Sequence, residues 1–152
     1  MKQASVLHRA WAEIDLSALE HNVRCIQEIL PEHTDFMAVV KADAYGHGDE
    51  GICTALHQMG IHWFAVSNLE EALAVRQYCP DSEIFILGYT PPEYAANMIF
   101  LDITQEVHSL AYAQELNEAL AGTNYILNVH LKLDTGMTRI GFFAYDNDRT
   151  LD

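Results

Sequence analysis

Short, fully apolar runs alternate along the chain with amphipathic stretches. Uninterrupted runs rich in Val, Ile, Phe and Tyr are typical of strands that are buried on both faces. They recur about every 20 to 27 residues, which is the length of one strand and one helix together. The five predicted strands cover residues 36–40, 63–66, 84–87, 103–107 and 125–133, and the fourth has the weakest pattern.

The segments between these runs carry helix signals. Ser17 and Glu20 form a capping box ahead of an apolar face that ends at Pro31. Asn68 and Glu71 repeat this device before a predicted helix over residues 69–79. Further helices are predicted from Asp49 to Met59 with Gly60 as the cap, from Pro91 after Thr90, and from Ser109 with Gly122 as the cap.

The order of elements is therefore one helix followed by five strands with helices between them. Such alternation predicts an α/β protein with a parallel sheet, either open and doubly wound or closed as a (β/α) TIM-type barrel. Open nucleotide-binding sheets carry G-x-G-x-x-G after the first strand, and residues 41–48 lack it. We favour the barrel, incomplete here with about five βα units, because a closed one needs eight strands and ~250 residues. The open sheet of a smaller protein is the alternative.

Composition and charge limit the class of partner. Hydrophobic residues make up 50% of the chain, which is ample for a packed core. The net charge of −14, from 8 basic and 22 acidic residues, argues against binding nucleic acid through phosphates. No apolar run approaches the ~18 residues of a membrane span, and the first twelve residues lack the layout of a secretory signal. We expect a cytoplasmic protein with no membrane partner.

Cysteine and histidine spacing gives no sign of a metal site. Cys25, Cys53 and Cys79 stand far apart, and all three fall in predicted helices. We expect them to be buried as small hydrophobic residues. No cysteine or histidine pair has zinc spacing, and the eight histidines form no H-x-x-x-H pair. We predict no metal ligands.

Lys41 directly follows the first predicted strand, so it lies at the carboxyl end of that strand. In barrels, catalytic side chains converge at this end. A lysine partly removed from water there is a good amine nucleophile, as formation of a Schiff base requires. The alternative is a lysine that only extends its ammonium group to water at a strand end. Position alone leaves both interpretations open.

The residues after Lys41 could line the same opening. Tyr45 could point its phenol toward it, or could only cover the rim. Gly46 and Gly48 allow the backbone to pass close to a ligand, or they only shape a loop. His47 is more simply a surface residue.

A second polar constellation ends the fifth strand. Lys132 and Asp134 share one face of a strand, where opposite charges could pair. Arg139 lies beyond the strand in a turn flanked by glycines, and its guanidinium suits a carboxylate or a phenolate oxygen. An internal salt bridge from Arg139 to Asp134 is the alternative.

Two stretches of the chain resemble the signatures of alanine racemases. Residues 38–48, A-V-V-K-A-D-A-Y-G-H-G, closely resemble the pyridoxal-phosphate attachment motif of that family, with Asp43 where Asn is more usual. Residues 130–142, in which Lys132 and Arg139 stand seven apart, are similar to the second signature. Residues 9–16, 64–72 and 86–90 support the match. The resemblance covers nearly the whole chain but less than half of the family's usual length.

The resemblance implies a fold-type III enzyme, in which a (β/α)8 barrel precedes a C-terminal β domain and the working unit is a homodimer. Pyridoxal 5′-phosphate is the implied cofactor. Lys41 would hold it covalently and act as the base on one face of the substrate. Tyr45 would bind the cofactor phosphate, and Val39 and Leu87 would line its ring.

The same resemblance implies roles for the second signature. Arg139 would bond the cofactor's phenolic oxygen and help to hold the substrate carboxylate. Lys132 would be the lysine that is carbamylated in this family. Carbamylation turns a cation into an anion that can orient Arg139, and it explains why two cations lie close together.

The implied function is racemisation of L- and D-alanine, which supplies D-alanine for peptidoglycan. Residues 1–152 would be the N-terminal portion of the barrel domain, with the later strands and the C-terminal β domain absent. Because that domain carries the second base, we expect little or no activity from these 152 residues alone. The alternatives are a serine racemase of the vancomycin-resistance type, a non-catalytic pyridoxal-phosphate-binding protein, and a degenerate fragment without a ligand.

Overall fold

The computed structural model describes residues 10–144. The chain divides into two compact units, one ending at Thr34 and the other beginning at Asp35. Within the described residues, the first unit contains helix α1 (Leu16–Ile29), and the second contains the strands and the other helices.

Helix α1 begins two residues earlier than the capping box predicts. Its N-cap is Asp15, whose carboxylate accepts hydrogen bonds from the backbone N–H groups of Ser17 at 2.9 Å and Ala18 at 3.2 Å. The prediction that Ser17 caps the helix is therefore wrong. A carboxylate is a strong acceptor for the free N–H groups at a helix N-terminus, and the Ser17 hydroxyl also donates to Asp15, at 2.6 Å.

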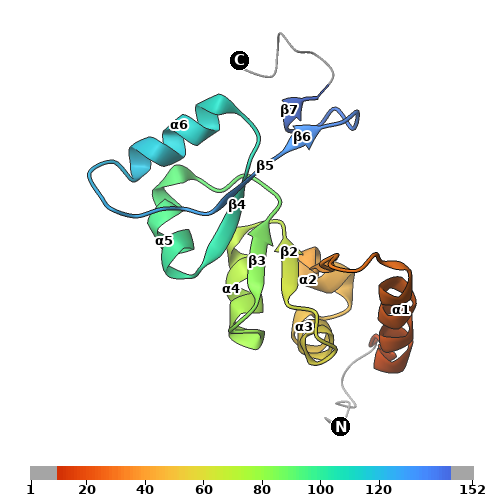
Figure 1. The fold of residues 1–152 in the computed structure, drawn as a ribbon. Helices are drawn as coiled ribbons and strands as arrows, with labels where there is room; N and C mark the ends of the chain where they lie inside the picture. The colour runs from red at the N-terminus through yellow and green to blue at the C-terminus, as the bar shows by residue number, and fades with distance from the viewer. Residues whose placement is uncertain (1–9, 145–152) are drawn as a thin grey trace. The chain divides into compact units, whose positions relative to one another are not determined.

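Five parallel strands form one sheet in the second unit (Figure 1). They are paired in the order in which they occur along the chain: β1 (Met37–Val39), β2 (Trp63–Val66), β3 (Glu83–Ile86), β4 (Ile103–Val107) and β5 (Val129–Leu131). A doubly wound sheet reverses its strand order at a switch point, whereas this sheet does not. The sequential order is that of a (β/α) barrel, so the open doubly wound alternative is wrong.

The helices follow the strands as predicted, and their contacts tie them to the sheet. Helix α4 packs on β2 and β3, and α5 packs on β4. The helical segments of this unit are α2 (Lys41–Gly46), α3 (Asp49–Gln58), α4 (Leu69–Tyr78), the 3-10 turn η1 (Pro92–Tyr94), α5 (Ala95–Phe100) and α6 (Leu110–Ala119).

Of the other predicted N-caps, two are confirmed and one is wrong. The side chains of Asn68 and Ser109 accept the N–H groups that open α4 and α6. Thr90 does not cap a helix. Pro91 precedes the 3-10 turn η1 rather than an α-helix, and the N-terminus of η1 has no side-chain cap. The Thr90 carbonyl instead accepts a hydrogen bond from the buried Tyr112 hydroxyl at 2.6 Å. Two adjacent prolines supply no N–H group for a cap to bind.

Burial follows the position of each strand in the sheet. The central strands supply fully buried side chains, including Phe64, Ile84 and Ile86. All three residues of β5 are exposed, so the prediction that this strand is buried on both faces is wrong. The reason is that β5 lies at an edge and has one neighbouring strand, β4.

The predicted fifth strand is also shorter than its apolar run. Residues 125–128 are not a strand, and after Lys132 the chain forms a separate parallel pair of β6 (Leu133–Asp134) and β7 (Phe142–Phe143). Among the cysteines, Cys53 and Cys79 are buried as predicted, and burial raises the pKa of the Cys53 thiol to about 12. Cys25 is exposed. Its prediction is wrong because it lies on the exposed side of α1.

Candidate active site

Lys41 lies at the carboxyl end of β1, as the sequence predicts. Its side chain is half-buried, and the amine nitrogen lies 6.0 Å from the centre of the Tyr45 ring. The hydrogen bond from the Val40 N–H to the Ala65 carbonyl, at 2.9 Å, anchors the end of β1 to β2. Lys41 and Tyr45, the two candidate residues of the first motif, are close together.

The backbone after Lys41 is unusual. Residues 42–45, none of them glycine, have φ between 50° and 57°, a continuous left-handed turn. Such a conformation costs about 1–2 kcal/mol per residue. Hydrogen bonds offset part of this cost: the Ala44 N–H donates to the Val40 carbonyl at 2.9 Å, and the Asp49 N–H donates to the Asp43 carboxylate at 2.8 Å. Strain of this kind is concentrated at functional sites.

Glu71 is the residue of this site that the sequence analysis missed. Its Oε1 accepts the N–H of Ala42 at 2.9 Å, directly after Lys41. Its Oε2 accepts both the N–H of Ser67 at 2.8 Å and the Ser67 hydroxyl at 2.7 Å. Glu71 was predicted only as part of a capping box with Asn68. Its position in the first turn of a helix was the available signal, but the bond to Ala42 spans 29 residues.

The charge state of Glu71 reflects these contacts. Burial by itself would raise the pKa of this carboxyl group, but the bonds from Ser67 and Ala42 and the positive charge of Lys41 outweigh it. The pKa therefore lies below its usual value. The Glu71 carboxyl group is thereby held in its charged form.

Val39 and Leu87 are placed by strand alternation. Ala38 and Val40 are buried, whereas Val39 is 42% exposed although it is apolar. Val39 is the last residue of β1, and because successive strand residues point to opposite faces, its side chain lies on the face of the sheet opposite to Ala38. The register pairs Val39 with Ala65 and Ala65 with Phe85, so Leu87, two residues further on, lies on that face as well. Val39 and Leu87 therefore lie on the same face of the sheet, near the carboxyl ends of their strands.

The polar residues that end the fifth predicted strand form neither the Lys132–Asp134 pair nor the Arg139–Asp134 salt bridge. Lys132 is half-buried, and its N–H donates to the Val107 carbonyl at 2.9 Å. Asp134 is buried, and its carboxylate accepts the N–H groups of Gly136 and Thr138, each at 2.9 Å. These backbone bonds hold the pKa of Asp134 below its usual value. Asp134 thus organises the turn that carries Arg139.

The predicted ion pairs of this region are wrong. Between residues 10 and 144, Arg24 pairs with Glu20, and the imidazoles of His57 and His108 contact the carboxyl groups of Asp81 and Glu106. Neither Lys132 nor Arg139 pairs with Asp134, because the Asp134 carboxylate already accepts backbone N–H groups. Arg139 is exposed. The structure does not bring Arg139 into contact with Lys41.

The sequence analysis also missed Glu106, a buried acidic residue on the face of the sheet that carries Leu87. Glu106 is fully buried in β4, and its Oε1 lies 2.9 Å from Nδ1 of His108. Its Oε2 has no partner among the described residues. The register pairs Thr104 with Phe85, so Glu106 shares the face of Leu87. A charged residue inside an apolar strand was the available signal.

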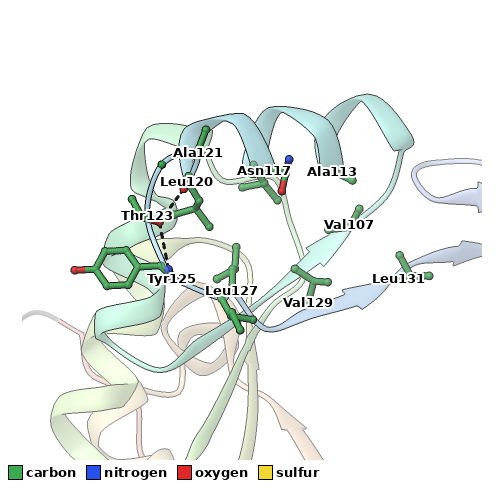
Figure 2. Close-up of a pocket in the computed structure, with 13 residues that line it drawn as sticks. Val107, Ala113, Asn117, Leu120, Ala121, Thr123, Tyr125, Leu127, Val129 and Leu131 are labelled. Carbon is green, nitrogen blue, oxygen red and sulfur yellow. Dashed lines mark hydrogen bonds between the residues drawn. The ribbon is translucent and has the colours of Figure 1, made fainter.

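A groove of about 530 Å³ lies elsewhere in this unit, between α6 and the segment that leads into β5 (Figure 2). Its lining is mostly apolar and includes Leu116, Leu120 and Val129. None of Lys41, Tyr45, Lys132 or Arg139 lines it. The groove therefore belongs to the packing of the sheet edge rather than to the candidate active site.

The sequence matches the family model of the alanine racemase N-terminal domain over residues 14–151. The chain belongs to this family. Within residues 10–144, no helix has the length and hydrophobicity needed to span a membrane.

Relatives of the alanine racemase family are similar over most of this chain. An amino-acid racemase of Enterococcus faecalis is 39% identical over 99% of the chain and 20% of its own length. An alanine racemase of Desulfovibrio desulfuricans is 44% identical over 86% of the chain and 35% of its own length. The chain therefore spans about a third or less of the curated relatives that it matches.

A solved structure of alanine racemase from Clostridium difficile 630 superposes with a TM-score of 0.81 and 38% identity, over 90% of this chain and 36% of the other. The five-stranded parallel sheet with its helices is thus part of an alanine racemase-type (β/α) barrel. The predicted fold class, an incomplete TIM-type barrel, is confirmed.

Proposed function

We propose that this chain is part of a pyridoxal-phosphate-dependent racemase that interconverts L- and D-alanine and supplies D-alanine for peptidoglycan in the cytoplasm. The observation that carries the proposal is the half-buried amine of Lys41 at the carboxyl end of β1. Lys41 lies within residues 38–48, which resemble a motif of the family to which the chain belongs, and it follows the exposed apolar residue Val39 by two positions.

The residues present suit the proposed cofactor. Lys41 supplies a primary amine that can condense with an aldehyde. Tyr45, which is 59% exposed, offers a phenol for the phosphate, and Val39 and Leu87 offer apolar surface for the ring. Arg139 offers a guanidinium for the phenolic oxygen and for a substrate carboxylate. When bound, the cofactor spreads the negative charge that is left after removal of the α-proton.

The protein's own part is to move that proton between the two faces of the substrate, which needs one base on each face. Lys41 is the base on one face. Glu71 positions it, because its carboxylate holds the Ala42 N–H and so the turn that begins at Lys41. The second base belongs to the partner subunit of a homodimer, in a C-terminal β domain.

Lys132 is carbamylated in this proposal. The ammonium group loses one proton to become an amine, and the amine adds to carbon dioxide and releases a second proton, so that a negative charge replaces a positive one. Since neither Lys132 nor Arg139 pairs with Asp134, the carbamate is free to hold Arg139. Residues 1–152 are then the N-terminal portion of the barrel domain, and by themselves they have little or no racemase activity.

Covalent trapping tests the proposal. The chain is mixed with pyridoxal 5′-phosphate, reduced with borohydride, digested, and mapped by mass spectrometry. We expect the label on Lys41, its loss in Lys41→Ala, and its retention in Lys132→Ala. A label on Lys132, or no label on folded protein, would contradict the assignment of Lys41.

Turnover then separates an enzyme from a cofactor carrier. We expect the protein with its later barrel strands and β domain to exchange the α-proton of alanine in heavy water, whereas the 152 residues exchange it little. A carrier would take the label on Lys41 without exchange in either form.

Alanine and serine are the two candidate substrates. The similar protein of Enterococcus faecalis is named only as an amino-acid racemase, which makes serine the second candidate. Comparing the turnover of the two amino acids distinguishes them, and a serine preference would overturn alanine as the substrate.

A further inference from the structure

Three side chains of ligand type meet at the end of the sheet opposite to Lys41. His57 lies in the last turn of α3, His62 directly precedes β2, and Asp81 precedes β3. Their candidate ligand atoms all lie within 4.8 Å of one another. Imidazole nitrogens and carboxylate oxygens are the ligands that zinc and similar ions take from proteins.

The backbone holds the two histidines at fixed positions. The His57 carbonyl accepts the N–H of Gly60 at 3.0 Å, which closes the end of α3. The His62 carbonyl accepts the N–H of Glu83 at 2.8 Å, which ties the residue before β2 to the start of β3. Their rings meet edge to face, with centroids 4.8 Å apart.

Arg76 holds the third ligand in place. Its Nη1 donates to the carbonyls of Pro80 at 3.0 Å and Ser82 at 2.6 Å, the residues on either side of Asp81. Its Nε and Nη2 donate to the carbonyls of Leu101 at 3.0 Å and Asp102 at 2.7 Å. The turn that presents Asp81 is thus clamped, and supporting bonds of this kind are what a preorganised site requires.

The distances suit one ion after a small movement. Nε2 of His57 lies 2.8 Å from Oδ1 of Asp81. In a tetrahedral zinc site with bonds of about 2.1 Å, two ligand atoms lie about 3.4 Å apart. The widest separation, which is up to 4.8 Å, must therefore close by about 1.4 Å, and the pair of His57 and Asp81 must open by about 0.6 Å. His62 and Asp81 are exposed, so rotation of their side chains can provide this.

We propose that His57, His62 and Asp81 form a binding site for a divalent transition-metal ion of the zinc class, with water completing the coordination. Two imidazoles and one carboxylate favour such ions over magnesium and calcium, which prefer oxygen ligands. A bound ion would tie the end of α3 to the turns before β2 and β3. The site does not depend on the proposed racemase activity.

This site was absent from the sequence analysis because its ligands are distributed. His57 and His62 are five residues apart, and Asp81 follows nineteen residues later, so no short motif contains them. A different pair of side chains of ligand type lies within helix α1, where Nε2 of His21 is 3.6 Å from Sγ of Cys25. That pair offers two ligands and serves as the matched control.

Calorimetric titration of the chain with zinc, and with magnesium for comparison, tests the proposal. We expect one zinc ion per chain and no comparable binding of magnesium. His62→Gln, at an exposed position, should weaken zinc binding by more than about tenfold, because loss of even an outer partner of a ligand costs about 10–100-fold. His21→Gln should bind as the unchanged chain does. Zinc should also raise the melting temperature of the unchanged chain and of His21→Gln, but not of His62→Gln.

A spectrum reports the ligands directly. With copper(II), electron paramagnetic resonance should show coupling to two imidazole nitrogens in the unchanged chain and to one in His62→Gln. Absence of zinc binding, or binding that His21→Gln removes and His62→Gln does not, would overturn the proposal. In that case the contact between His57 and Asp81 is only a hydrogen bond.

Discussion

Glu71 shows how much one carboxylate can organise. It accepts hydrogen bonds from Ser67 at the end of β2 and from Ala42 in the left-handed turn after β1. Hydrogen bonds to a charged acceptor are shorter and stronger than neutral ones. They offset part of the cost of a backbone that four consecutive residues adopt against their steric preference. The turn and the amine of Lys41 are thereby held together.

Replacing Glu71 by Gln should loosen this turn. The amide has one acceptor oxygen, so either the Ala42 or the Ser67 N–H group loses its partner. We expect the free energy of unfolding to fall by about 1–3 kcal/mol and the borohydride trapping of pyridoxal phosphate on Lys41 to slow. Urea unfolding and timed mass mapping measure the two effects. Glu70→Gln, an exposed neighbour, is the control; equal trapping rates in all three proteins would contradict the positioning role.

The contribution of Glu71 should also depend on pH. Its pKa in the fold lies below the usual value of 4.5, so its stabilising effect is fully present above that value. The effect is lost as the pH falls through the lower pKa of the folded state. We expect the stability difference between the unchanged chain and Glu71→Gln to be constant near neutral pH and to shrink below about 4.5. Unfolding measured at a series of pH values checks this, and a difference that grows in acid would contradict it.

At the scale of elements, the pair β6 and β7 encloses the turn that carries Arg139. The Phe142 N–H donates to the Lys132 carbonyl at 2.8 Å, and Asp134 accepts two N–H groups of the turn. Gly141 directly precedes β7 and lies close to the backbone of residues 132–134. A Cβ at this position would come within 2.8 Å of both the Asp134 nitrogen and the Lys132 oxygen, and φ is 127°.

Gly141→Ala should therefore open this pair. A side chain at this φ is strained, and backbone atoms cannot move aside as a flexible side chain can. We expect a loss of more than about 1 kcal/mol in stability and faster hydrogen exchange at Phe142. Gly51→Ala is the matched control: it lies in α3 with nothing within 4 Å of the added atom, and it should stabilise the chain by about 0.5–1 kcal/mol. Similar effects at both positions would show that close approach is not the cause.

At the scale of the whole molecule, the sheet has two edges, β1 and β5. The edge at β5 is bordered by exposed apolar side chains, of which Ile126 is 84% and Leu131 is 69% exposed. They continue into the groove beneath α6 (Figure 2). Unpaired strand edges with apolar neighbours readily pair with another chain.

We therefore expect the chain to self-associate through β5, and Ile126→Lys to reduce that association by adding charge at the edge. Light scattering over a range of protein concentrations measures it. Ile29→Lys, at a position that is 80% exposed in α1, is the control and should change little. Self-association that persists in Ile126→Lys and disappears in Ile29→Lys would place the contact in the other unit.

Local pattern predicted much of this protein. Strands β2 and β4 have the predicted bounds, and Asn68 and Ser109 cap the predicted helices. Such features depend on neighbours within a few residues. The helix start at Asp15 was missed because two acceptors compete within one turn, and the burial of β5 was overestimated because an apolar run does not reveal how many strands will flank it.

The amino-acid sequence by itself determined the order of strands and helices, the place of Lys41 at the end of the first strand, and the family. Hydrophobic periodicity, caps and short motifs are local, so they are legible without a fold. Only the tertiary structure decided that Glu71 would reach Ala42, that Asp134 would bind backbone rather than a cation, and that His57, His62 and Asp81 would meet. Each of these depends on which distant segments become neighbours, and it is the pairing and packing of the sheet that sets this.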